Sequence, residues 1–150
     1  MDEIFRRGEC RNFKELTPVP DEQLLTLVKA GMQARSVGNQ KDRDFIIVTR
    51  EDLVKAISHN SIVAGPARKA SAAIVIVGKK EGVSFPDEWS FDCAAAAENI
   101  LLEAEHLGLG SLWLQVYPYQ DRKIPLCNIL DIPTDLNPFC IVVTATAERT

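Results

Sequence analysis

Three arginines near the start of the chain are the side chains best suited to bind a charged ligand. Arg6 and Arg7 are adjacent, and Arg11 follows them across a short loop that begins at Gly8. A guanidinium group is planar and presents several N–H donors, so arginines on one turn can converge on a single phosphate group. The cluster therefore suits a phosphate site, whereas solvated surface charge is the commoner role of a short arginine cluster taken alone.

A turn further along the chain contains small polar residues that could contact a ligand. Ser36, Gly38 and Asn39 can present backbone and side-chain donors there. The simpler alternative is an ordinary connection between a helix and a strand. The turn by itself does not decide between these two roles.

Cysteine and histidine usage supports neither a metal site nor a disulfide framework. The chain has only two histidines and no Cys-x-x-Cys motif, and its cysteines are widely separated. They are Cys10, Cys93, Cys127 and Cys140. We therefore expect reduced and mostly buried thiols, no bound metal ion, and no catalytic cysteine or histidine.

Length and composition predict one domain over residues 1–150, with enough apolar material for a core, because 46% of the residues are hydrophobic and 25% are charged. A net charge of -4 and a sequence pI near 5.2 disfavour binding to nucleic acid or to an anionic membrane. No apolar run is long enough to span a bilayer, and the charged first residues lack the apolar core of a signal peptide. We therefore expect a cytoplasmic protein.

The longest predicted element is a helix within residues 91–110. Alanine and leucine favour a helix there, Asp92 can cap its start, and Gly108 with Gly110 can end it. The first turns carry small apolar residues on every side, which predicts a buried helix. A strand at 111–116 should follow directly.

The remaining hydrophobic patterns place helices and strands in loose alternation. We predict further helices at 2–7, 21–32, 51–58 and 119–130, the last of them broken at Pro125. Further strands are predicted at 44–49, 71–78 and 139–145. This order predicts a single-domain α+β fold, with one mixed sheet and helices on both of its faces.

Together these segments resemble the nitroreductase family of flavin mononucleotide (FMN) oxidoreductases along essentially the whole chain. Residues 4–13 resemble the family's opening, Arg-Arg-Ser-Ile-Arg followed by a basic and an aromatic residue, with Arg7 and Arg11 in matching positions. In the family this segment binds the phosphate, ribityl and pyrimidine parts of the flavin. The resemblance implies the same role for it here.

Three later segments extend the resemblance. Residues 34–40 resemble the family's Ala-Pro-Ser-Ala-Gly-Asn segment, which contributes to the flavin site of the partner subunit. Residues 94–110 are similar to the family's long central helix, which builds the dimer interface. Residues 113–116 are similar to the strand end whose backbone faces the flavin ring.

The resemblance implies a homodimer that transfers hydride from NADH or NADPH to FMN, and from reduced FMN to a small electron-poor acceptor such as a nitro compound or a quinone. The flavin does the redox chemistry, so no side chain is needed as acid or base. The flavin contacts it implies are Arg7, Gly8, Glu9, Arg11, Ser36, Gly38, Asn39, Leu114, Gln115 and Val116.

The sequence departs from the family pattern at several positions. Glu9 stands where the family has serine, Gly8 replaces a usual arginine, and Lys-Asp-Arg at 41–43 replaces Gln-Pro-Trp, which predicts a charged wall near the ring. Family members also continue into a C-terminal tail beyond the position of Thr150. The alternative is therefore a nitroreductase-like domain without firm flavin binding that serves as a structural or interaction module. A phosphate-sensing or nucleic-acid module is disfavoured by the net acidity.

Overall fold

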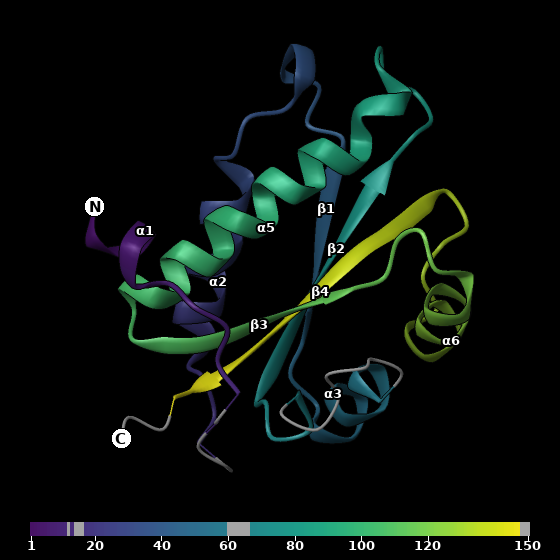
Figure 1. Ribbon diagram of the computed structural model, residues 1–150. Coiled ribbons are helices and arrows are strands. Elements are labelled where there is room, and N and C mark those ends of the chain that lie inside the picture. Colours follow the sequence, from purple (N-terminus) through teal and green to yellow (C-terminus); the bar gives the residue numbers. More distant parts are fainter. Residues whose placement is uncertain (12, 14–16, 60–66, 148–150) are drawn as a thin grey trace.

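Four antiparallel strands form the sheet at the centre of the chain (Figure 1). The computed structural model describes residues 1–11, 13, 17–59 and 67–147. The strands are β1 (Arg43–Val48), β2 (Ala72–Lys79), β3 (Leu109–Gln115) and β4 (Leu136–Thr146), in the spatial order β1-β2-β4-β3. Every neighbouring pair is antiparallel, so the predicted mixed sheet is wrong in strand direction. The continuous apolar runs of β2 and β4 resemble those of parallel strands because both faces of this sheet are covered.

Helices cover both faces of the sheet, as predicted. The described helices are α1 (Asp2–Arg6), α2 (Asp21–Met32), α3 (Glu51–Ser58), α5 (Trp89–His106) and α6 (Gln120–Leu130), with short 3-10 turns η1 (Val37–Asn39) and η2 (Pro86–Glu88). Apart from the long helix, the predicted helices and strands lie within three residues of these bounds. The α+β class is confirmed.

Two apolar clusters hold the layers together, one on each face of the sheet. On one face Ile74 and Ile76 of β2 pack with α2 and α5, and on the other Val75 and Val77 pack with α3 and α6 (Figure 1). Successive side chains of a strand point to opposite faces, so β2 supplies both clusters. The arrangement fixes α5 across the sheet.

The long helix α5 begins two residues before the predicted start, at Trp89, and ends at His106. Asp92 therefore lies inside the helix and does not cap it, and its carboxylate instead accepts the backbone N–H of Val37 at 3.0 Å. The predicted stop at Gly108 is confirmed, because this glycine has a φ of 75° that other residues rarely adopt. Gly110 already belongs to β3.

The helix α6 runs unbroken through Pro125, so the predicted break is wrong. A proline inside a helix lacks the N–H that would bond to the carbonyl four residues earlier. Burial of Leu126 in the core beside α3 favours continuing the helix despite that loss.

The segment after α1 crosses the outer edge of the sheet. Cys10 N–H donates to the Ser111 carbonyl at 2.9 Å, and Phe13 forms an antiparallel bridge with Ala147. Since β3 is an edge strand, this segment pairs with backbone groups that would otherwise be open. No helix in the described ranges is long and apolar enough to cross a membrane.

Candidate functional site

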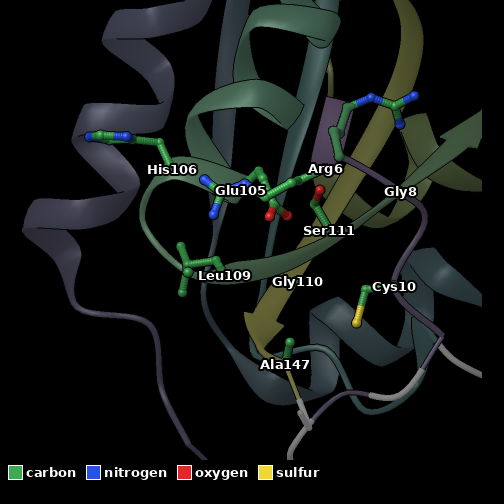
Figure 2. Close-up of a pocket in the computed structure, with 11 residues that line it drawn as sticks. Arg6, Gly8, Cys10, Glu105, His106, Leu109, Gly110, Ser111 and Ala147 are labelled. Carbon is green, nitrogen blue, oxygen red and sulfur yellow. The ribbon is translucent and has the colours of Figure 1, made fainter. Parts of the chain in front are cut away.

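Arg6 and Arg7, but not Arg11, border a pocket between α1, the end of α5 and the start of β3 (Figure 2). The pocket has a volume of about 340 Å³. It is lined by Arg6, Arg7, Gly8, Cys10, Glu105, His106, Gly108, Leu109, Gly110, Ser111 and Ala147. Three of these side chains can carry positive charge and one is acidic, so the pocket suits an anionic ligand.

A second hollow of about 220 Å³ adjoins the first and shares Arg7, Gly8 and Ser111 with it. Its remaining lining residues are Glu9, Glu98, Leu101 and Trp113. A Cβ atom built on Gly8 would meet no atom within 4 Å, so the space beside this backbone is open. The two hollows therefore form one open surface along the N-terminal segment and β3.

Arg7 is held in place by α5. Its Nε lies 3.1 Å from Glu98 Oε1, and its side chain is 32% exposed. Nε and Oε1 are the nearest atoms of this contact, and the partial exposure of the side chain lets an anion reach the guanidinium group. Arg6 makes a looser contact, 3.9 Å from Glu3.

Arg11 pairs with Glu9, the acid that departs from the family pattern. Arg11 Nη2 donates to Glu9 Oε2 at 2.8 Å, and both side chains are about half exposed, at 53% and 50%. Exposed ion pairs contribute little to stability, at most about 1 kcal/mol, so a phosphate group can compete with Glu9 for this arginine.

A histidine contact joins α1 to the last turn of α5. His106 Nδ1 lies 3.0 Å from Glu3 Oε1. The hydrogen bond with His106 is the main cause that lowers the pKa of Glu3 to about 2, and the same bond raises the pKa of His106. The contact fixes α1, and with it Arg6 and Arg7, beside the pocket.

The predicted turn with Ser36, Gly38 and Asn39 lies near the opposite end of α5 (Figure 1). It contacts α5 at Asp92, whereas the arginine pocket contacts α5 at His106. At 1.5 Å of rise per residue, about 21 Å of helix separates Asp92 from His106, and about 9 Å separates Asp92 from Glu98, where Arg7 contacts α5. One chain therefore does not bring this turn into the arginine pocket.

The predicted strand-end residues lie at the far end of β3. Leu114 and Val116 are buried, and Val116 N–H donates to the Phe139 carbonyl at 3.0 Å. The Gln115 side chain accepts from Trp113 Nε1 and donates to the Tyr117 carbonyl, both at 2.6 Å. These groups are engaged within the chain, and a contact of this strand end with a flavin ring stays a prediction.

The charged wall predicted from residues 41–43 is wrong for two of the three side chains. Asp42 is fully buried and Arg43 is 7% exposed, whereas Lys41 is exposed. Arg43 donates to backbone carbonyls, including that of Arg35 at 2.8 Å. Buried charges of this kind belong to the interior of the chain and cannot face a ligand.

Sequence reasoning missed several pocket residues because they come from distant segments. His106 had a signal, since it is one of two histidines and ends the long helix, where a cation is favoured. Ser111 and Cys10 had none beyond their proximity to predicted elements. Among the described residues, no group of three or more His, Cys, Asp and Glu side chains could hold a metal ion.

Comparisons with known proteins agree with this fold. The sequence profile of the Nitroreductase family matches residues 61–145. A protein of Archaeoglobus fulgidus named "Putative NADH dehydrogenase/NAD(P)H nitroreductase" is 37% identical over 140 residues, which cover 93% of this chain and 80% of that protein. The chain belongs to the nitroreductase family, which confirms the expected class of nitroreductase-type oxidoreductase.

Two solved structures show how closely the fold is shared. The crystal structure titled "Putative NADH Oxidase" from Clostridium acetobutylicum has a TM-score of 0.93 and 35% identity, covering 99% of this chain and 89% of that chain. An FMN-dependent nitroreductase from Clostridium difficile has a TM-score of 0.88 and 26% identity, covering 99% of this chain and 87% of that chain.

Proposed function

We propose that this protein is an FMN-dependent oxidoreductase that uses NADH or NADPH to reduce small electron-poor molecules such as nitro compounds or quinones. It acts as a homodimer that binds the flavin between its subunits. The observation that carries the proposal is the open surface formed by the two hollows, which Arg7 and Gly8 both border. The FMN dependence of the Clostridium difficile relative supports the choice of cofactor.

The residues around the hollows fit a flavin nucleotide. The guanidinium group of Arg7 is partly exposed and can bind phosphate oxygens, and the absence of a side chain at Gly8 leaves room beside the backbone. Arg11 can approach the pyrimidine side of the ring once Glu9 releases it. A cation there stabilises negative charge on a reduced ring.

When bound, FMN would supply the redox chemistry, accepting a hydride from NAD(P)H and passing it to the acceptor. The protein's own residues bind and orient. We propose that the flavin contacts are Arg7, Gly8, Glu9 and Arg11 of one subunit, Ser36, Gly38 and Asn39 of the other, and the strand end Leu114, Gln115 and Val116. No side chain is assigned as a general acid or base.

Exposed apolar side chains on α1 and α5 support a dimer. Phe5 is 87% exposed and Phe91 is 67% exposed, and Ile4 is half exposed. Ile4 and Phe5 lie on α1 beside the end of α5, and Phe91 lies near its start, so large apolar side chains are exposed at both ends of this helix. Exposed apolar surface of this kind is typical of a face that binds another protein. A second copy of the chain would also bring its own 36–39 turn toward the arginine pocket.

The test is a titration of the purified chain with FMN, followed by flavin fluorescence, and then addition of NADH or NADPH without oxygen. We expect saturable binding of one FMN per chain and loss of the absorbance of oxidised flavin with at least one donor. A nitroaromatic compound or a quinone should then restore that absorbance.

One observation favours the alternative of a flavin-free module, because Glu98 and Glu9 already pair with Arg7 and Arg11. If the arginines serve only these ion pairs, no accessible concentration of FMN will saturate the protein. That result would reject the oxidoreductase proposal and leave a structural or interaction role.

A further inference from the structure

A buried group of charged side chains lies beneath the 36–39 turn, outside the proposed flavin contacts. Among the described residues, the buried charged side chains are Asp42, Arg43 and Asp92, which are 0%, 7% and 1% exposed. Isolated charges are costly to bury, so a group of this kind must balance its charges or neutralise some of them.

Arg43 is occupied by backbone carbonyls. Its guanidinium group donates to the carbonyls of Ala34, of Arg35 at 2.8 Å and of Asp92 at 3.0 Å. It thereby joins the chain after α2 to α5, and it makes no ion pair with either carboxyl group in the described part of the chain. One buried cation beside two ionised carboxylates would leave a net negative charge. If the two carboxyl groups hold one proton between them, the remaining negative charge is balanced by Arg43 and the group is neutral.

The two carboxyl groups are close neighbours. Gln40 Nε2 lies 2.8 Å from Asp42 Oδ2 and 3.5 Å from Asp92 Oδ2. The second oxygen of Asp42, Oδ1, is buried and accepts no hydrogen bond from the described residues. An ionised carboxylate with an unpaired buried oxygen is unfavourable, but a neutral carboxyl group can donate its proton to the neighbouring acid.

The surroundings also favour the neutral form of Asp42. Burial is the main cause that raises its pKa, and the hydrogen bond to Asp92 raises it further. Of the facing groups, Arg43 favours an ionised carboxylate, and burial raises the pKa of the Cys93 thiol, which stays neutral. Lys79 offers its backbone N–H to the Asp42 carbonyl, while its ammonium group pairs with the exposed Asp44.

The same two acids hold the turn. Asp92 Oδ1 accepts Val37 N–H at 3.0 Å, and Gln40, which bonds to Asp42, also bonds to both backbone groups of Phe85 at 3.0 Å. Gly38 has a φ of 55°, and a Cβ there would lie only 2.8 Å from the Phe85 ring. The conformation of the turn thus depends on contacts that lead back to the carboxyl pair.

We propose that Asp42 and Asp92 share one proton and together position the 36–39 turn, so that loss of this proton at high pH releases the turn. Because the folded chain holds the proton more tightly than the unfolded chain, the stabilisation is greatest at low pH and is lost as pH rises through the raised pKa. The link to flavin rests on the proposed function, since this turn is assigned to the flavin site of the partner subunit.

Amide hydrogen exchange of the flavin-free protein tests the carboxyl pair directly, from about pH 6 to about pH 10 and after correction for intrinsic exchange rates. In the wild-type chain, protection of the amides at 37–41 should fall by about tenfold or more with rising pH. In the Asp42→Asn variant the amides at 37–41 should stay protected over the whole pH range, because the side-chain amide can replace the protonated carboxyl group. Asp44→Asn is the matched control and should behave like the wild type, since Asp44 is exposed.

Three results would overturn the proposal: wild-type protection that does not change with pH, a turn loosened at neutral pH by Asp42→Asn, or failure of that variant to fold. A parallel FMN titration separates this proposal from the proposed function. Affinity that falls with pH in the wild type but not in Asp42→Asn supports both proposals. If FMN does not bind but the exchange pattern is as expected, the proposed FMN-dependent function is rejected and the proposal of a shared proton stands.

Discussion

At the scale of single residues, the site consists of arginines whose partners are already in place. Arg7 is oriented by Glu98 from α5, and Arg11 is paired with Glu9 two residues away. The first contact orients a guanidinium group that stays partly exposed, whereas the second must open before Arg11 can bind a ligand. The resemblance identified both arginines, but the pairing of Arg7 could not be predicted because it joins residues ninety-one positions apart.

The arginines should differ in their importance for FMN. Arg11→Ala should weaken FMN binding about tenfold or more relative to Arg6→Ala, because a charge-assisted hydrogen bond contributes roughly 1.5 to 3 kcal/mol. Arg6 is the comparison because it carries the same charge on the same segment and lines the first hollow, but lies outside the positions that match the family. Flavin fluorescence titrations measure both affinities, and equal losses would mean that the arginines act only as diffuse surface charge.

At the scale of elements, α5 organises the site because it contacts the arginine segment toward one end and the 36–39 turn near the other. Its alanine-rich sequence predicted a long buried helix, and its glycine stop was predicted correctly. The role of Asp92 could not be predicted, because a carboxyl group near a helix start normally indicates a cap. Here that carboxyl group binds a turn more than fifty residues earlier in the chain.

The contact between α1 and α5 should depend on pH. Its stabilisation from Glu3 is present above the ordinary pKa of about 4.5 and is lost as pH falls toward about 2. Its stabilisation from His106 is present below the ordinary histidine pKa of 6.5 and is lost as pH rises through the raised value. The contact is therefore strongest between the ordinary pKa of glutamate, about 4.5, and the ordinary pKa of histidine, 6.5.

A histidine NMR titration checks this contact. Glu3→Gln should lower the pKa of His106, since the amide cannot stabilise the charged imidazole as a carboxylate does. The resonances of His59, which follows α3 elsewhere in the chain, serve as the internal reference in both spectra. An unchanged His106 titration would show that the two side chains do not interact in solution.

At the scale of the whole molecule, the class of fold followed from the sequence but the direction of its strands did not. Apolar runs at 71–78 and 139–145 predicted buried strands correctly, yet periodicity carries no information on which strands are neighbours or how they run. The same limit applies to the site. The 36–39 turn and the arginine segment belong to one site by resemblance, and the fold of a single chain keeps them apart.

The exposed face of α5 should determine the oligomeric state. Phe91→Glu should convert the expected dimer into a monomer with unchanged helix content, because Phe91 is 67% exposed and a buried charge there would be unpaired. Ala96→Glu, on the same helix, cannot test the dimer interface. Ala96 is fully buried within its own chain, so a glutamate there should unfold the protein. Light scattering after size exclusion measures the mass, and a wild-type monomer at micromolar concentration would contradict the dimer.

Subunit complementation tests the shared flavin site most directly. One chain carries Arg7→Ala with Arg11→Ala, and the other carries Asn39→Gly, which keeps the positive φ of 54° at that position. Each variant alone should bind FMN weakly because every site in its dimer is damaged. Mixed dimers that are purified with two different affinity tags should regain one intact site, and therefore half of the wild-type FMN stoichiometry at wild-type affinity. Mixed dimers that bind no better than either parent would contradict a flavin site shared between subunits.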